Sequence, residues 1–153
     1  MGRHLFLLVV ALLLACGPRF DPRELDAVES EIASRIGAAA TALQGLDGGA
    51  LRAERERLVQ LRLRAETLRL PGEAWEVRAG LLAALDATAD GLGVAATAVD
   101  LEREAEGMPS DPVRGKEIAD RAGRSMELCR QRFEEALAAL GRVHEARAKL
   151  EAK

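Results

Sequence analysis

Apolar residues recur at steps of three and four along most of this 153-residue chain. Residues at this spacing share one face of a helix, so the pattern predicts amphipathic helices rather than strands. It defines four segments, 22–46, 50–70, 73–106 and 111–153. Aromatic residues make up only 3% of the chain, whereas sheets favour aromatic and β-branched residues, so the composition also indicates packed helices.

Each segment carries one stripe of apolar residues that we expect to form the core. In chain order the stripes are Leu25, Val28, Ile32, Ile36, Ala39 and Leu43; Leu51, Leu58, Leu61, Ala65 and Leu68; Trp75, Leu82, Leu85, Ala89, Leu92, Ala96 and Val99; and Ile118, Ala122, Met126, Cys129, Phe133, Leu137, Leu140 and Val143. No segment shows a sustained alternation of apolar and polar residues, so the sequence predicts an all-α fold.

Capping and turn residues separate the segments. They are Asp21-Pro22 and Asp111-Pro112 at two helix starts, Asp47-Gly48-Gly49 and Pro71-Gly72 between helices, and Gly107 at a helix end. Inside the third segment, Gly91 and Gly93 weaken the helix, because Gly in a helix interior costs about 1 kcal/mol. This segment therefore either continues to Glu106 or kinks or breaks at the two glycines.

Charge alternates along the four segments. The net charges of residues 21–46, 50–70, 71–107 and 111–153 are −3, +3, −6 and +2. In an up-down antiparallel four-helix bundle, sequence neighbours lie side by side and the last helix returns beside the first, so every adjacent pair would be opposite in sign. The unequal lengths leave a second arrangement open, a long hairpin of the last two helices with the two shorter helices packed on one end.

A different kind of segment precedes the helices. Arg3 supplies a positive charge, and residues 5–15 form an unbroken apolar run of 11 residues. A helix needs about 20 residues to span a hydrocarbon core, so the run is too short for that. Its length and flanks are typical of the core of a signal peptide.

The end of this run resembles the lipobox of bacterial lipoproteins. The lipobox pattern is Leu, a small or aliphatic residue, Ala or Gly, and an invariant Cys, and the chain has Leu13-Leu14-Ala15-Cys16, in which the second Leu is bulkier than usual. The resemblance implies cleavage before Cys16, a thioether-linked diacylglycerol on its sulfur, and an acyl chain such as palmitate on its new amine. An ordinary secretory signal with a chance Cys, or an uncleaved anchor, is the alternative.

The resemblance divides the chain into three parts. Residues 1–15 would be the signal peptide, residues 16–20 the lipidated Cys and a short tether, and residues 21–153 the helical bundle domain. The four tether residues after the Cys reach at most about 14 Å, so the folded part would sit close to the lipid headgroups. Gly17 rather than Asp follows the Cys, and in the enteric sorting rule this favours the outer membrane. We therefore expect a bacterial cell-envelope protein, lipid-anchored and facing the periplasm.

The sequence also bounds the chemistry of the domain. A net charge of −3 excludes a generic nucleic-acid binder, and two Cys and two His are too few for a disulfide scaffold or a usual zinc site. The motifs Gly-x-Ser-x-Gly, Glu-x-x-His and Cys-x-x-Cys-His do not occur. We therefore expect no enzymatic activity, and we assign no catalytic residue, cofactor or metal.

Two residues of the last segment invite a chemical interpretation. Cys129 lies on the apolar stripe, and we interpret it as a small buried hydrophobe. The alternatives are an intermolecular disulfide or, together with Met126, a pair of soft ligands of the kind that Cu(I) prefers. We interpret His144, which lies one turn beyond Leu140, as a residue at the edge of the bundle.

Six arginines crowd the second segment. They are Arg52, Arg55, Arg57, Arg62, Arg64 and Arg69. The neighbouring segments are acidic, so we expect intramolecular ion pairs, with anionic headgroups or an acidic partner as the alternative.

The predicted membrane anchor and the amphipathic helices, in a sequence without a recognisable catalytic motif, predict a structural or interaction role. We expect an adaptor or accessory subunit that binds another envelope protein through a helix face. The alternative is a small-ligand or metal-binding periplasmic bundle that uses the space near Met126, Cys129 and His144.

Overall fold

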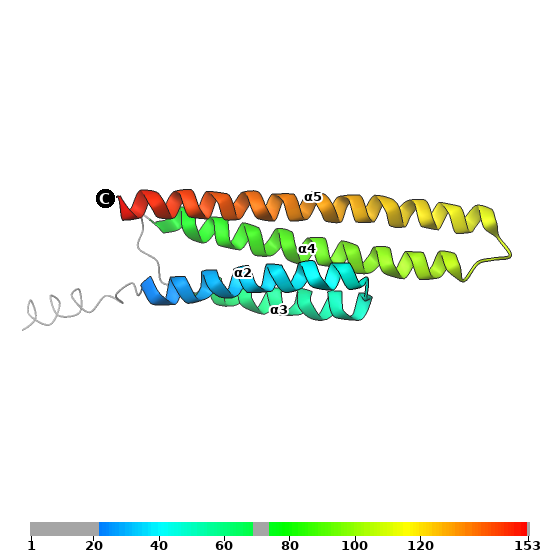
Figure 1. Cartoon of the computed structure of the whole chain (residues 1–153), viewed down its shortest axis with the longest axis horizontal. Coiled ribbons are helices and arrows are strands. Elements are labelled where there is room, and N and C mark those ends of the chain that lie inside the picture. Colours follow the sequence, from blue (N-terminus) through cyan, green and yellow to red (C-terminus); the bar gives the residue numbers. More distant parts are fainter. Residues whose placement is uncertain (1–21, 69–73, 153) are drawn as a thin grey trace, which may run out of the picture.

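The computed structural model describes residues 22–68 and 74–152. These residues form four α-helices and no strand, which confirms the all-α prediction. The helices are α2 (Pro22–Gly45), α3 (Gly48–Glu66), α4 (Trp75–Glu106) and α5 (Pro112–Glu151). Consecutive helices run antiparallel (Figure 1).

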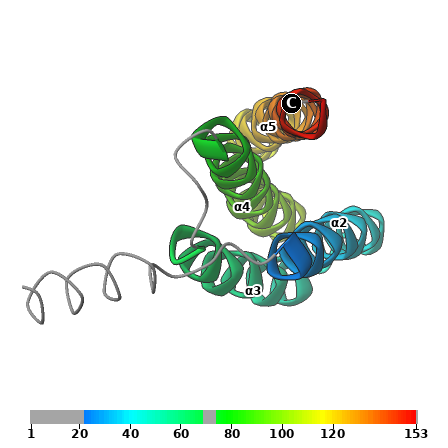
Figure 2. The same ribbon diagram turned by 90° about the vertical axis from the view of Figure 1, so that its left-hand side faces the viewer.

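The two longest helices, α4 and α5, form a hairpin, and the shorter pair α2 and α3 packs against α4 toward one end of that hairpin (Figure 1). Figure 2 shows the same arrangement from the end that carries the start of α2 and the end of α5. The helix α4 is central, because it contacts α2, α3 and α5. Of the two arrangements left open by the sequence, the structure therefore has the long hairpin with two shorter helices.

The capping residues mark the helix boundaries well. The side chain of Asp47 accepts hydrogen bonds from the backbone N–H groups of Gly49 (2.8 Å) and Ala50 (3.4 Å), and Asp111 accepts one from Arg114 (3.1 Å). Because Asp47 is itself the N-cap, α3 begins at Gly48 rather than at residue 50, and it ends at Glu66 rather than at residue 70.

The helix α4 is continuous through both glycines that could have broken it. A Cβ atom on Gly91 would lie 3.0 Å from the ring of Phe133, and one on Gly80 would lie 2.5 Å from Cγ2 of Val143. Gly80 and Gly91 therefore allow α5 to approach α4 closely. Packing of apolar surface at these contacts offsets the low helix propensity of Gly.

By length and composition α4 could cross a membrane, and the same test is met by the core helices of soluble proteins. In the most apolar window of α4, 56% of the residues are buried inside the bundle. Contact with three other helices accounts for this composition, because a helix that is covered on most sides has few positions for charged residues.

Two residues predicted for the core lie outside it. Trp75 is 65% exposed, because the N-cap Ala74 and Val77 face the core and Trp75 lies about 200° from Val77 around the helix. Leu137 is 61% exposed, and the neighbouring Ala136 is fully buried instead. The close approach of α4 and α5 selects small residues on α5, so the size of an apolar side chain was a poor guide to its burial.

Ion pairs between helices follow the alternation of charge. Arg64 of α3 lies 2.7 Å from Glu31 of α2, and Arg52 of α3 lies 2.9 Å from Asp100 of α4. Arg62 of α3 also pairs with Asp86 of α4. The expected intramolecular pairing of the α3 arginines is confirmed at these three positions. Such exposed pairs contribute about 0–1 kcal/mol each, so they select neighbours more than they stabilise the fold.

Candidate interaction surface

The helices α2 and α5 flank α4 without packing backbone against backbone. In their described parts, no Cα atom of α5 lies within 8 Å of a Cα atom of α2. Long side chains join them instead, since Arg147 of α5 lies 2.6 Å from Asp26 and also pairs with Glu29. The charge alternation anticipated attraction between the first and last helices, and the structure shows it at this end of the bundle.

The Arg147 contacts identify which sides of α2 and α5 are turned toward each other. On α5, Leu140, Phe133 and Met126 precede Arg147 at steps of seven and therefore share its side of the helix. On α2, Ile36 and Leu43 follow Glu29 at the same steps. All five apolar residues are only partly buried where they pack against the core.

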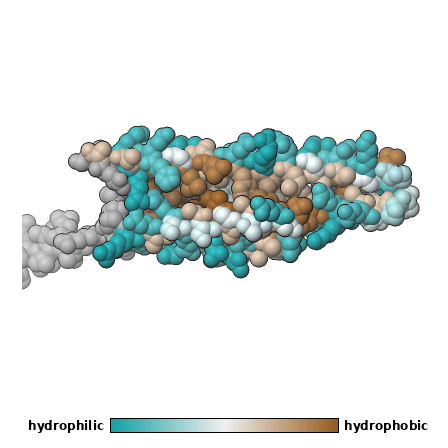
Figure 3. All heavy atoms as spheres, in the orientation of Figure 1, coloured by the Kyte–Doolittle hydropathy of each residue, from teal (hydrophilic) through white to brown (hydrophobic). Residues whose placement is uncertain are grey.

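We call this surface the open face and define it by Ile36, Leu43, Met126, Phe133, Leu137 and Leu140. Leu137 is its most exposed member and lies one turn from Leu140. Figure 3 shows a band of apolar side chains between the polar outer edges of α5 and α2. Single exposed apolar residues are ordinary, whereas a continuous apolar band with polar edges is typical of a surface that binds another molecule.

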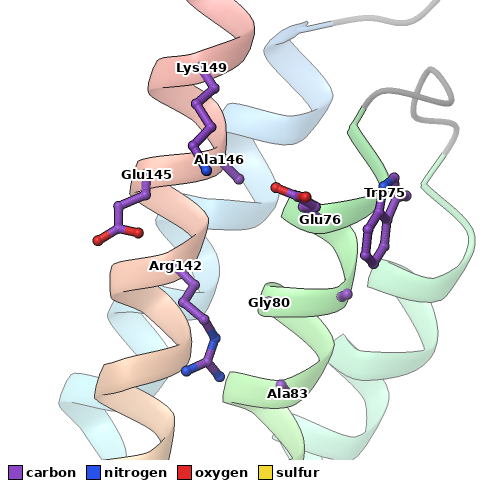
Figure 4. A pocket seen from close by; sticks show the side chains of 9 residues that line it. Trp75, Glu76, Gly80, Ala83, Arg142, Glu145, Ala146 and Lys149 are labelled. Atoms are coloured by element: carbon purple, nitrogen blue, oxygen red, sulfur yellow. The ribbon is translucent and has the colours of Figure 1, made fainter.

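A second concave region lies between the first turns of α4 and the last turns of α5. It is a pocket of 390 Å³, lined by Trp75, Glu76, Ala79, Gly80, Ala83, Arg142, Glu145, Ala146 and Lys149. Figure 4 shows Arg142 reaching from α5 toward α4 and Glu76 reaching from α4 toward α5. The small residues at positions 79, 80 and 83 leave the space open, because longer side chains there would fill it.

Another pocket, of 470 Å³, is lined by three arginines, Arg52 and Arg55 of α3 and Arg132 of α5. Arg52 is paired with Asp100, and Arg132 lies 2.8 Å from Glu135. The Glu135 carboxylate raises the pKa of Arg132 through a hydrogen bond and its charge. Neighbouring carboxylates therefore already compensate two of the three cations.

Glu54 is a buried carboxylate that the sequence interpretation missed. The residue is 4% exposed, and its oxygens lie 2.9 Å from Arg57 and 3.6 Å from Arg35. It lies three residues after Leu51 and four before Leu58, so its position on the apolar stripe was visible in the sequence. The two arginines keep the carboxylate compensated inside the bundle.

Cys129 is buried and unpaired, at 3% exposure, within the hydrophobic core. Burial raises the pKa of its thiol, because a buried site disfavours the charged thiolate. Interpretation as a small buried hydrophobe is therefore confirmed. An intermolecular disulfide at this residue would first require the core to open.

The structure does not bring the proposed soft ligands and the histidine together. Met126 is partly buried one turn from Cys129, whereas His144 is exposed 15 residues further along the same helix. At 1.5 Å per residue this separates Cys129 from His144 by about 22 Å. Within residues 22–68 and 74–152, no three His, Cys, Asp or Glu side chains are grouped so that they could hold a metal ion.

The predicted signal peptide at residues 1–15, the predicted lipidation site Cys16 with its tether at residues 16–20, and Arg69 lie outside the described residues. Comparison of the chain with known protein families, with curated proteins and with solved structures gives no match.

Proposed function

We propose that this protein is a lipid-anchored component of a bacterial cell envelope that binds another envelope protein through the open face. The anchor is a diacylglycerol on Cys16, and the domain beyond residue 20 lies on the periplasmic side, with Gly17 favouring the outer membrane. The lipobox-like sequence supports the anchor, and the exposed apolar band between α2 and α5 supports binding. The role is that of an adaptor or accessory subunit without catalysis.

The open face is the single observation that carries the binding role. A closed bundle would cover the apolar sides of α2 and α5 with each other, but here these helices are joined by Arg147 and otherwise leave apolar residues accessible. Burial of apolar surface is the main favourable term in protein association. A partner helix with an apolar stripe would bury Leu137 together with its half-buried neighbours.

The anchor is tested by comparing the wild-type protein with the Cys16→Ala variant in cell fractionation and mass spectrometry. We expect the wild type in the membrane fraction, cleaved before Cys16 and carrying acyl chains. The Cys16→Ala variant should lack lipid and should not occur as the same cleaved membrane form. An unmodified Cys16 in the mature wild type would remove the anchor from the proposal.

The binding surface is tested with a matched pair of variants on α5. Leu137 and Leu128 are both exposed, at 61% and 41%, but only Leu137 belongs to the open face. After chemical crosslinking in intact cells, we expect Leu137→Arg to abolish an adduct that Leu128→Arg retains. Equal loss with both variants, or with neither, would contradict binding through the open face.

A further inference from the structure

The end of the bundle at which α2 begins also carries an exposed tryptophan. The helices α2 and α4 both begin at this end, and α5 ends there (Figure 1, Figure 2). Trp75 is the first residue of α4 and lines the same pocket as Ala146 and Lys149 of α5. The neighbouring Arg147 pairs with Asp26 near the start of α2.

Core packing does not account for a tryptophan at this position. Its neighbours Ala74 and Val77 are 1% and 0% exposed and supply the contacts of this turn with the core, whereas Trp75 is 65% exposed. An indole ring combines a large apolar area with one N–H donor. In membrane proteins such side chains gather at the level of the lipid headgroups, where one end is apolar and the other is hydrated.

The charges around Trp75 suit a headgroup layer. Arg142 and Lys149 line the pocket beside it, and Glu76 and Glu145 line the same pocket. The cations can contact lipid phosphates, while the carboxylates can contact the ammonium groups of zwitterionic lipids. A purely anionic pocket would be repelled by the lipid phosphates, and a purely apolar pocket would be unfavourable in the hydrated headgroup layer.

We propose that Trp75 and this pocket contact the lipid surface, with the indole ring inserted among the headgroups. This inference rests on the proposed anchor at Cys16. From Cys16 to Pro22 the chain makes six residue steps, which reach about 20 Å when extended. Because a helix with its side chains is about 10–12 Å wide, this tether holds the whole end of the bundle close to the bilayer.

The chain offers a direct test, because Trp75 is its only tryptophan and it has no tyrosine. The mature lipidated protein, beginning at Cys16, is reconstituted into vesicles of phosphatidylethanolamine and phosphatidylglycerol, with or without brominated acyl chains. We expect the emission of Trp75 to shift to shorter wavelength relative to the unlipidated Cys16→Ala protein in buffer. We also expect brominated lipid to quench it, because bromine quenches indoles that it contacts.

A relocated tryptophan provides the matched control. Val113 is 71% exposed in the first turn of α5, at the opposite end of the hairpin. The double variant Trp75→Phe, Val113→Trp should float with the vesicles as the wild type does, and its emission should remain unquenched. Because both positions are exposed, we expect unchanged circular dichroism and melting temperature.

Vesicle flotation separates failure of the anchor from failure of the lipid contact. Wild-type protein that floats while its Trp75 remains unquenched overturns the lipid contact and leaves the anchor intact. A shift to shorter wavelength without bromine quenching would show that protein covers Trp75, and equal quenching at positions 75 and 113 would show that neither end is preferred. Either result also overturns the inference. Protein that fails to float overturns both the anchor and the inference.

Discussion

The guanidinium of Arg147, near the end of α5, lies 2.6 Å from Oδ1 of Asp26 near the start of α2. The two residues are 121 positions apart in sequence, and no backbone contact joins their helices. Arg147 also pairs with Glu29, whose side chain is only 17% exposed. This ion pair therefore connects the first and last helices across an otherwise open side of the bundle.

Arg147→Gln should lower the free energy of unfolding by about 1–2 kcal/mol, because it leaves the partly buried Glu29 without its cation. Arg130→Gln is the control, since Arg130 pairs only within α5 and at the surface, and it should cost less than about 0.5 kcal/mol. Urea unfolding monitored by circular dichroism measures both. Equal effects would mean that the α2–α5 contact contributes nothing beyond a surface pair.

Two helical glycines should respond to alanine with opposite sign. Gly80→Ala places a Cβ 2.5 Å from Val143 and should cost about 1–3 kcal/mol by overpacking the contact between α4 and α5. Gly141→Ala meets nothing within 4 Å and should stabilise by about 0.5–1 kcal/mol, since alanine favours the helix. Thermal unfolding of the two variants gives the signs, and a stabilised Gly80→Ala protein would contradict the close approach.

Two replacements of Glu54 test whether its negative charge or the volume of its side chain contributes to the stability of the fold. Glu54→Gln should cost about 1 kcal/mol, because an amide forms weaker contacts with the two arginines. Glu54→Leu should be close to neutral or stabilising, because it joins the apolar stripe while Arg57 and Arg35 have access to water. Denaturant unfolding compares the variants. A leucine variant that is less stable than the glutamine variant would show that this carboxylate itself holds α2 and α3 together.

Because the Cys129 thiol is buried, we expect it to be alkylated slowly in the folded protein and to make the stability of the fold depend on pH. Because its pKa is raised in the folded state, the folded protein retains the proton longer than the unfolded chain does. Its contribution to stability is therefore complete below the ordinary thiol pKa of about 8.5 and falls as the pH rises above it. In a Cys16→Ala background, alkylation should be much slower in the native than in the unfolded state.

The control for this pH dependence is Cys129→Ala in the same background. The stability difference between the two proteins should change above the ordinary thiol pKa and stay constant below it. Alkylation of the native protein at the rate of the unfolded chain would contradict a closed core at this position.

Leu46, which follows α2, has a φ of 46°, in the left-handed region that favours glycine. Leu46→Gly should raise the free energy of unfolding by about 1 kcal/mol, because it relieves this conformation at an exposed position. Leu46→Ala is the matched control, since alanine keeps the strain and should not stabilise. Differential scanning calorimetry gives both values, and a gain with alanine equal to that with glycine would attribute the effect to the lost leucine side chain.

Much of the architecture was accessible from the sequence because it rests on local signals. The spacing of apolar residues and the caps at Asp47 and Asp111 give four helices nearly in place, and alternating charges anticipate which helices attract each other. Trp75 and Leu137, which the apolar pattern wrongly assigned to the core, show the limit of this prediction. A stripe defined by large apolar residues cannot tell that close helix packing turns Ala74 and Ala136 inward instead.

By itself the sequence determined that this chain is helical and, approximately, where its helices begin and end. It also showed that residues near its start resemble an export signal with an acylated cysteine. These properties depend on residues a few positions apart. Only the tertiary structure decided that Gly80 and Gly91 bring α5 against α4, that α2 and α5 stay apart, and that Glu54 is enclosed while Trp75 remains accessible. Those outcomes depend on distances between helices, which side chains from distant parts of the chain set together.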